Sequence, residues 1–174
     1  MYIMLIGFMG TGKTTLGRAL AADLDVSFCD LDQYIEQRYM KSVSMLFKEV
    51  GEAGFRQIES RLLREVGEFE DVVISCGGAT PLFNDNMDYM NSCGVTVWLD
   101  SSVGALFRRL KVAGMSRPLI SGKTDVELMR YIKEELSRRT PFYEKAAYRY
   151  SGDRLESVGQ VAESVAGVRE ILGI

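Results

Sequence analysis

The sequence has 174 residues, 47% of them hydrophobic, which suits one domain with a sizeable core. Its formal net charge of -3 argues against a generally basic nucleic-acid surface. Histidine is absent, which excludes Ser-His-Asp hydrolysis, cysteine–histidine pairs and zinc sites with histidine ligands.

The first elements along the chain are an apolar strand and a helix. Residues 2–6 form a short apolar run, as in a strand that is buried on both faces. Leu16, Leu20 and Leu24 recur every four residues, as on one face of a helix. The glycine-rich stretch "GFMGTGKTT" lies between them and predicts a specialised loop.

This loop fits the phosphate-binding pattern Gly7-x4-Gly12-Lys13-Thr14. Its backbone N–H groups can surround a phosphate, while Lys13, expected to be an exposed loop lysine, adds charge and Thr14 offers a hydroxyl to a metal. The alternative is a turn that only connects two elements. The residues predicted to contact ATP are Gly10, Thr11, Gly12, Lys13, Thr14 and Thr15. Switches, motors and kinases share this motif.

Further buried strands are predicted downstream, with helical segments between them. This alternation predicts an α/β fold in which a parallel sheet is covered by helices on both faces. The apolar runs that suggest strands are Val26–Cys29, Val72–Cys76, Val95–Leu99 and, more weakly, Tyr148–Tyr150.

Three apolar stripes predict helices in the second half, and Ser101 is the expected cap of the first. The stripes are Val103, Leu106, Phe107 and Leu110; Leu128, Ile132 and Leu136; and Val158, Val161, Ala162, Val165 and Leu172. No repeat or linker divides residues 1–174.

Residues 112–124, "VAGMSRPLISGKT", interrupt the helical pattern with two glycines and a proline. The segment is predicted to be a loop. It could close as a lid over a phosphate, or it could be an ordinary surface loop, and composition favours neither.

The tripeptide Asp-Leu-Asp occurs twice, which provides an internal control. Asp23 and Asp25 follow a helix and are expected on the solvated surface, whereas Asp30 and Asp32 follow a strand. Ligands of open α/β sheets bind beyond the carboxyl ends of strands. The second pair is therefore the candidate for holding magnesium and orienting an attacking hydroxyl, although such a pair alone is usually a polar turn.

Gly77-Gly78 also follows a predicted strand, where a bare backbone could admit a ligand or simply form a tight turn. Arginine is the natural partner of carboxylates and phosphates. Arg56, Arg117 and Arg139 are candidates, but composition cannot choose them from the other arginines of the chain.

Cysteine usage and the apolar pattern bear on location. Cys29, Cys76 and Cys93 are odd in number and widely spaced, which favours reduced thiols over disulfides. Apolar runs are too short for a membrane span, and the first strand follows Met1 too closely for a signal or transit peptide. A cytoplasmic protein with no membrane or nucleic-acid partner is expected.

Taken together, the motifs resemble the shikimate kinase family across nearly the whole chain. The stretches that carry the resemblance are "GFMGTGKTTLGRALA", "FCDLDQYIE", "GFRQIES", "ISCGGAT", "RPLI" and "RRTPFYEKAA". It implies a fold similar to nucleoside monophosphate kinases, a three-layer α/β/α P-loop NTPase domain with a five-stranded parallel sheet. A mobile lid at 112–124 and a substrate-binding helical segment at 32–64 are implied as well.

The activity implied by this resemblance is transfer of the ATP γ-phosphoryl group to the 3-hydroxyl of shikimate, with Mg²⁺, by a monomeric enzyme of aromatic amino-acid biosynthesis. Lys13 would contact phosphates, with Thr14 on the magnesium and Asp30 reaching it through water. Asp32 would bind the shikimate hydroxyls and act as the base. Arg117 would swing over the transferring phosphate.

The same resemblance assigns the two ends of the site. Arg56 and Arg139 would hold the shikimate carboxylate, and the pocket would be lined by Gly77, Gly78 and Ala79. Arg109 would contact adenine, and Arg154 would lie in the adenine loop and contact ATP.

Two residues depart from the family pattern, which usually has a glycine at Ala79 and a threonine at Cys76. An alanine keeps its backbone N–H, so the pocket should survive if the φ angle of Ala79 is negative. Affinity for the substrate is what these departures put in question.

Three alternatives remain open at this stage. One is another small-molecule kinase, such as a gluconate or nucleotide kinase. A second is a nucleotide-dependent switch, although the Asn-Lys-x-Asp guanine motif of GTPases does not occur in the chain. The third is an inactive relative, against which the presence of Lys13, Asp30, Asp32 and Arg117 speaks.

Overall fold

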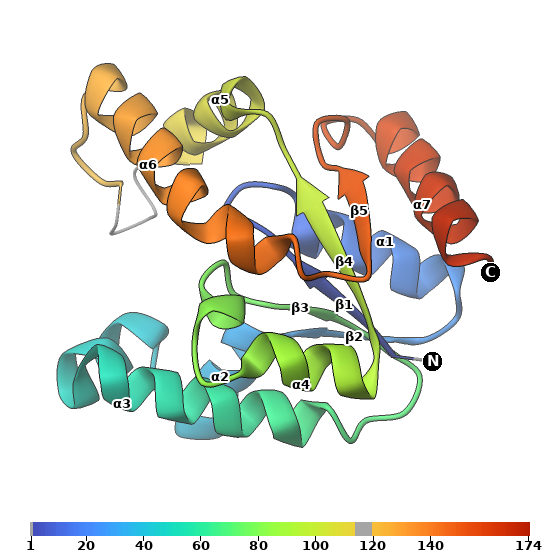
Figure 1. The fold of residues 1–174 in the computed structure, drawn as a ribbon, viewed down its shortest axis with the longest axis horizontal. Helices are drawn as coiled ribbons and strands as arrows, with labels where there is room; N and C mark the ends of the chain where they lie inside the picture. Colours follow the sequence, from blue (N-terminus) through green and yellow to red (C-terminus); the bar gives the residue numbers. More distant parts are fainter. Residues whose placement is uncertain (1, 114–119) are drawn as a thin grey trace.

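A five-stranded sheet forms the centre of the computed structural model, which describes residues 2–113 and 120–174 (Figure 1). All strand pairs are parallel, in the order β2-β3-β1-β4-β5. The predicted parallel sheet is confirmed, and each strand matches its predicted bounds to within one residue. The strands are β1 (Tyr2–Ile6), β2 (Ser27–Asp30), β3 (Val72–Ser75), β4 (Val95–Asp100) and β5 (Tyr148–Ser151).

Strand burial explains how clearly each strand could be recognised in the sequence. All four residues of β3 are buried, as are the last four of β1, so both read as continuous apolar runs. Strand β5 lies at an edge of the sheet and is largely exposed. Its sequence, YRYS, therefore carries a weaker apolar signal.

Helices cover both faces of the sheet and make three layers (Figure 1). Helices α1 (Lys13–Asp23) and α7 (Val158–Leu172) pack on one face. The other face carries a larger set, namely α2 (Leu31–Tyr39), α3 (Val43–Val66), α4 (Asn86–Cys93), α5 (Val103–Ala113), α6 (Asp125–Tyr143) and the short 3-10 helix η1 (Thr80–Leu82). The three-layer architecture is thereby confirmed.

Strand β1 shows how the sequence builds the two core layers. Ile3 and Leu5 join the cluster under α1 and α7, whereas Met4 and Ile6 join the cluster on the opposite face. Successive side chains of a strand point to opposite faces, so an unbroken apolar run serves both layers.

The predicted apolar stripes fall within α5, α6 and α7, but the cap of α5 differs from the prediction. The expected cap was Ser101, but the hydroxyl of Ser102 accepts the hydrogen bond from the backbone N–H of Ala105, at 3.2 Å. The prediction was one residue too early, because Ser101 and Ser102 have the same capping chemistry and sequence alone does not separate them.

Helix α3 also contains a break at Gly51, where φ is 71° and ψ is 179°.

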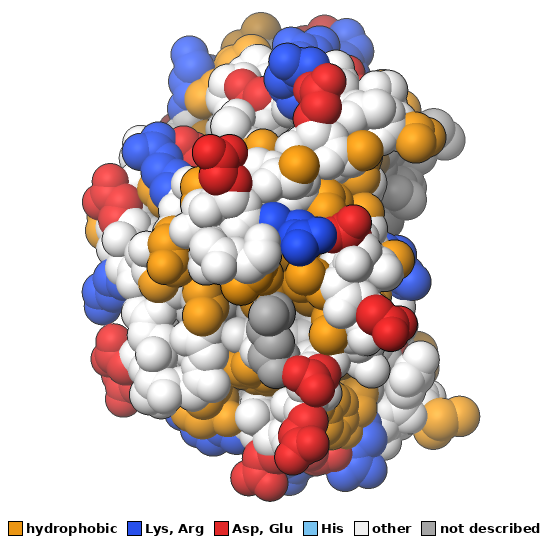
Figure 2. All heavy atoms as spheres, turned by 90° about the vertical axis from the view of Figure 1, so that its right-hand side faces the viewer, with side chains coloured by type: hydrophobic (Ala, Val, Ile, Leu, Met, Phe, Trp, Pro, Cys, Tyr) orange, Lys and Arg blue, Asp and Glu red, His pale blue; other side chains and the backbone are white. Residues whose placement is uncertain are grey.

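Figure 2 shows the side of the molecule that lies on the right in Figure 1, where acidic and basic side chains are interspersed. Among the helices within residues 2–113 and 120–174, none has both the length and the apolar character needed to cross a membrane.

The strand order determines where a site can form. The chain leaves β1 toward one edge of the sheet to form β2 and β3, and then crosses to the other side of β1 to form β4. Ligands of such sheets bind beyond the carboxyl ends of the strands at this reversal point. The loop after β1, Gly7–Gly12, lies there together with the ends of β2 and β3.

Candidate active site

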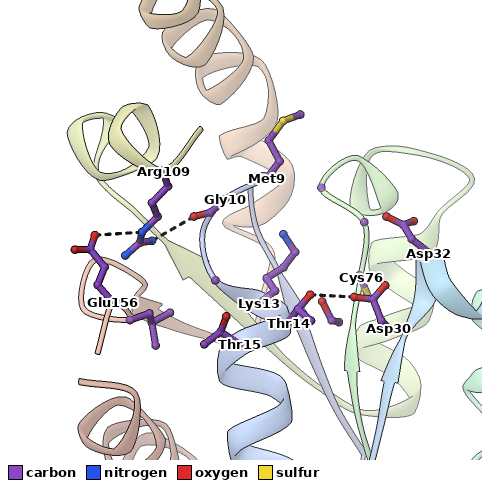
Figure 3. Close-up of a pocket in the computed structure, with 15 residues that line it drawn as sticks. Met9, Gly10, Lys13, Thr14, Thr15, Asp30, Asp32, Cys76, Arg109 and Glu156 are labelled. Atoms are coloured by element: carbon purple, nitrogen blue, oxygen red, sulfur yellow. Dashed lines mark hydrogen bonds and ion pairs between the residues drawn. The ribbon is translucent and has the colours of Figure 1, made fainter. Parts of the chain in front are cut away.

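A cavity of about 540 Å³ opens at this edge of the sheet (Figure 3). Its lining includes most of the residues singled out from the sequence. These residues are Met9, Gly10, Gly12, Lys13, Thr14, Thr15, Asp30, Asp32, Ser75, Cys76, Gly77, Gly78, Arg109, Leu155 and Glu156. Of the loop residues predicted to contact ATP, Thr11 is absent from this lining, because its hydroxyl turns inward and donates to the Phe8 carbonyl at 3.0 Å.

Glycines of the loop after β1 are required by close contacts and by backbone angles. Gly7 has a φ of 140°, and a Cβ on it would lie 2.5 Å from the Leu99 carbonyl oxygen. Gly12 has a φ of 94°, and a Cβ there would lie 2.5 Å from Cδ1 of Leu155. Side chains at these positions would be both strained and obstructed, so the loop keeps the bare backbone that phosphate binding requires.

Lys13 begins helix α1 and lies across the cavity floor. Its Nζ donates to the carbonyl oxygens of Gly7 and Phe8, at 2.8 and 2.9 Å. The residue is only 8% exposed, so the expectation of an exposed loop lysine was wrong. The buried ammonium supports the loop from within, because it donates to two of the loop's backbone oxygens.

Thr14 and Asp30 bring two oxygen ligands together. The Thr14 hydroxyl donates to Oδ2 of Asp30 at 2.9 Å, and Oδ1 of Asp30 accepts from the backbone N–H of Gln33, capping α2. A hydroxyl and a carboxylate next to a phosphate loop are ligands that suit Mg²⁺, which usually retains waters and substrate phosphates. These residues therefore fit the predicted magnesium site.

Asp32 lies on the first turn of α2, on the far side of Lys13 from Arg109 (Figure 3). Burial, and then the neighbouring charge of Glu59, raise the pKa of Asp32 to about 6. A Cβ on Gly77 would lie 3.3 Å from Oδ1 of Asp32 and from Oε2 of Glu59. Gly77 thus leaves open the space between two carboxylates, and a base with a pKa near neutrality borders this space.

Glu59 is a buried carboxylate that the sequence reasoning missed. It is 1% exposed, accepts from the Thr80 hydroxyl at 2.7 Å and accepts from Nη1 of Arg56 at 2.9 Å. Nε of Arg56 is buried without a hydrogen-bond partner in the described part of the chain. The signal that could have revealed Glu59 is its i,i+3 spacing from Arg56 on a helix.

Arg139, on α6, approaches the same region from the opposite side. A Cβ on Gly78 would lie 3.3 Å from Nη1 of Arg139, and the Gly78 carbonyl accepts from the Tyr143 hydroxyl at 2.5 Å. Arg139 is 5% exposed and its guanidinium lies over the Phe8 ring, 5.0 Å from the centroid. Arg56, Ala79 and Arg139 lie beside the cavity rather than in its immediate lining.

Arg109 forms the other end of the site. Its Nη1 donates to the Gly10 carbonyl at 3.2 Å and its Nη2 to the Asp153 carbonyl at 3.0 Å, while Nε lies 3.5 Å from Oε1 of Glu156 (Figure 3). It ties the phosphate loop to residues 153–156. Arg154 behaves differently: its side chain is 67% exposed and pairs with Glu163 at 2.8 Å, outside the cavity lining.

The predicted lid lies only partly within the described structure. The loop was predicted to begin at Val112, but helix α5 continues to Ala113; residues 120–124 precede α6, with a turn at 120–122. Arg117 and the rest of 114–119 lie outside the described residues.

Comparisons with known proteins agree with this geometry. Residues 9–168 match the family model described as shikimate kinase. The chain belongs to the shikimate kinase family.

Relatives of this family match over nearly full length. A shikimate kinase of Phocaeicola vulgatus is 54% identical over 170 residues, covering 98% of this chain and 97% of the relative. The crystal structure of shikimate kinase from Bacteroides thetaiotaomicron superposes with a TM-score of 0.97 at 51% identity, covering 99% and 98% of the two chains. The Acinetobacter baumannii shikimate kinase, solved in complex with shikimate, gives 0.83 at 29% identity, covering 99% and 93%.

Both departures from the usual shikimate kinase pattern are accommodated. Ala79 has a φ of −102°, which satisfies the condition stated for keeping the pocket backbone. The Cys76 side chain is buried, with Sγ 3.7 Å from Sδ of Met90, and burial raises the pKa of its thiol. Cys76 is therefore a neutral packing residue under the Gly77-Gly78 turn.

Proposed function

We propose that the cavity binds ATP and shikimate side by side and transfers the γ-phosphoryl group of ATP to the 3-hydroxyl of shikimate, giving shikimate 3-phosphate and ADP. Membership of the shikimate kinase family supports this activity directly. The observation that carries the assignment of roles is the order of groups along the cavity. The phosphate loop and Arg109 occupy one end, and Asp32 and the Gly77-Gly78 turn occupy the other.

The donor end holds the nucleotide. Backbone N–H groups of Gly10–Thr15 and the Lys13 ammonium bind the phosphates, and Arg109 borders the adenine. Thr14 and, through water, Asp30 hold Mg²⁺, which when bound neutralises charge on the phosphates. Arg117 and Arg154 remain predictions from the sequence for contacts with ATP.

The acceptor end holds shikimate. Arg56 and Arg139 bind its carboxylate, because guanidinium groups that are mostly buried can donate strong hydrogen bonds to an anion. Asp32 accepts the proton of the shikimate 3-hydroxyl. The oxygen of that hydroxyl forms the new bond to the γ-phosphorus, and the bond between this phosphorus and the leaving ADP oxygen breaks. A pKa of about 6 leaves Asp32 ionised at neutral pH and basic enough for this step.

The wider assignments complete the proposal. Residues 32–64, within α2 and α3, form the acceptor-binding segment, and 112–124 form a lid that excludes water when closed. The enzyme acts as a cytoplasmic monomer.

The decisive experiment measures ADP release from ATP and Mg²⁺ with shikimate, gluconate and nucleoside monophosphates in parallel. Shikimate should support turnover far above the other acceptors. The variant Arg56→Gln serves as a control and should raise the KM for shikimate with little change in the KM for ATP. ADP release without preference for shikimate would overturn the assignment.

A further inference from the structure

The Arg139 guanidinium is held on one edge by Glu135, which lies one turn earlier on α6. Nε and Nη2 of Arg139 donate to Oε2 of Glu135 at 2.9 and 2.6 Å. One face of the same guanidinium lies over the ring of Phe8. The remaining nitrogen, Nη1, faces Gly78, which lines the cavity, since a Cβ on that glycine would lie 3.3 Å from it. The hydroxyls of Tyr131 and Tyr143 also interact with this guanidinium. Edge and face are thus both occupied by the protein, and one nitrogen is directed to the glycine turn.

Glu135 is itself fixed by a second arginine. Arg138 donates from Nε to Oε1 at 3.2 Å and from Nη2 to Oε2 at 2.8 Å. The side chains of Glu135 and Arg139 are 20% and 6% exposed, whereas that of Arg138 is 56% exposed. Hydrogen bonds from Arg138 and Arg139 hold the pKa of Glu135 below its usual range, so its carboxylate stays charged.

The net charge of the cluster formed by Glu135, Arg138 and Arg139 suits the binding of one carboxylate. Two arginines and one glutamate leave a single net positive charge. Because the Nε–Nη2 edge already has a carboxylate partner, an acceptor carboxylate meets Nη1 end-on instead of forming a bidentate pair with that edge. The direction of Nη1 then depends on how firmly Glu135 holds the opposite edge.

We propose that Glu135 is a positioning residue that presents Nη1 of Arg139 to the carboxylate of a monoanionic acceptor. The inference rests on the proposed function, in which Arg139 binds the shikimate carboxylate. It adds that the orientation of this arginine is set by a carboxylate of its own helix.

The first test compares Glu135→Gln with Glu134→Gln, the same change at the neighbouring exposed carboxylate of α6. Glu135→Gln should raise the KM for shikimate about tenfold, the loss of roughly one charged hydrogen bond, with kcat and the KM for ATP within about twofold of wild type. Glu134→Gln should behave as wild type. A lower KM for shikimate in Glu135→Gln would mean that Glu135 competes with the substrate for Arg139, which overturns the proposal.

A double-mutant cycle tests whether Glu135 acts through Arg139. The variant Glu135→Gln combined with Arg139→Lys should bind shikimate no more weakly than Arg139→Lys alone, because the group that Glu135 positions is already gone. Additive losses would show that Glu135 acts independently and would refute a positioning role.

A shikimate analogue with a neutral carboxamide separates the two hypotheses. If wild type binds shikimate and the carboxamide equally well, the proposed role of Arg139 fails. If wild type prefers shikimate and Glu135→Gln keeps the same preference, only the inference about Glu135 fails. Should Glu135→Gln not fold, Glu135→Asp withdraws the carboxylate while keeping its charge. It should show the same selective rise in KM, and an unchanged KM overturns the proposal.

Discussion

The proposed donor and acceptor halves of the cavity differ in how they are built. The phosphate loop is one contiguous stretch whose proposed ligand groups are mostly backbone N–H, kept accessible by Gly7 and Gly12. The acceptor half is assembled from side chains on α2, α3 and α6 and from the turn after β3; Arg56 and Arg139 are each held by a glutamate of their own helix. The donor half therefore depends on local chain geometry, whereas the acceptor half depends on long-range packing.

Removing the one charged side chain of the donor loop should have the largest effect. Lys13→Met keeps the aliphatic stem but loses the ammonium, so kcat should fall roughly 100- to 1,000-fold, as for loss of a preorganised donor to a developing anion. If the two halves act separately, the affinity for shikimate, measured by calorimetry, should change less than threefold. A threefold change corresponds to less than ~1 kcal/mol of binding free energy. Near-normal kcat would show that the loop is not catalytic.

Asp32 tests the acceptor half by opposite effects on rate and stability. Asp32→Asn should lower kcat about 100-fold at saturating magnesium, because the hydroxyl loses its proton acceptor. In the folded protein the pKa of Asp32 is about 6, against 3.8 for an unperturbed aspartate. The folded state thus binds more protons between about pH 4 and pH 6, and wild-type stability falls as pH rises through this window.

The variant lacks this ionisation, so it should be more stable than wild type at pH 7 by about 1 to 3 kcal/mol, and equal to it below about pH 4. Denaturant unfolding at both pH values measures the difference. A variant that is less stable at pH 7 would show that the charged carboxylate is stabilised by contacts that outweigh its burial.

Substitution of Asp30 should have a smaller effect, limited to the affinity for magnesium. Asp30→Asn can still cap α2, because asparagine caps helices as well as aspartate does. The magnesium concentration for half-maximal activity should rise about tenfold while kcat at saturating magnesium changes little, since the lost ligand acts through water. Asp23→Asn is the matched control from the other Asp-Leu-Asp, where the carboxylate pairs with Arg169 on the surface at 2.8 Å. Identical magnesium titrations of Asp30→Asn and wild type would contradict this role.

The arginines at the adenine end should affect only nucleotide binding, Arg109 about as strongly as Asp30 affects magnesium binding and Arg154 least of all. Arg109→Gln breaks contacts with the loop and with the Asp153 carbonyl, and should raise the KM for ATP about tenfold. Arg154→Gln removes an exposed ion pair, and its effect should stay below about threefold. Equal losses in the two variants would indicate that Arg154 reaches the nucleotide.

Local sequence was sufficient for the fold and for most of the donor half. Apolar runs in β1 and β3 and the glycine spacing of the loop are short-range signals, so they could be read without knowledge of packing. Burial of Lys13 could not be predicted, since it depends on the loop folding back over the side chain. The cap at Ser102 was misplaced because two adjacent serines offer the same chemistry.

In the acceptor half, sequence patterns alone did not choose Arg56 or Arg139 among the arginines, and the family resemblance did. Neither sequence patterns nor the family resemblance identified Glu59 or Glu135. Each is a carboxylate on a long amphipathic helix, where solvated glutamates are common, and only tertiary packing distinguishes a buried partner from a surface residue. The spacing of Glu135 from Arg139, four residues, is typical of exposed helix pairs as well.

Phe8 joins the two halves. Its carbonyl accepts hydrogen bonds from Lys13 and Thr11 on the nucleotide side, and its buried ring supports the Arg139 guanidinium on the acceptor side. If Phe8 shifts when one substrate binds, it therefore moves a residue that contacts the site of the other substrate. Coupling between two ligands is reciprocal in free energy, so any change that ATP makes in shikimate affinity through Phe8 must equal the change that shikimate makes in ATP affinity.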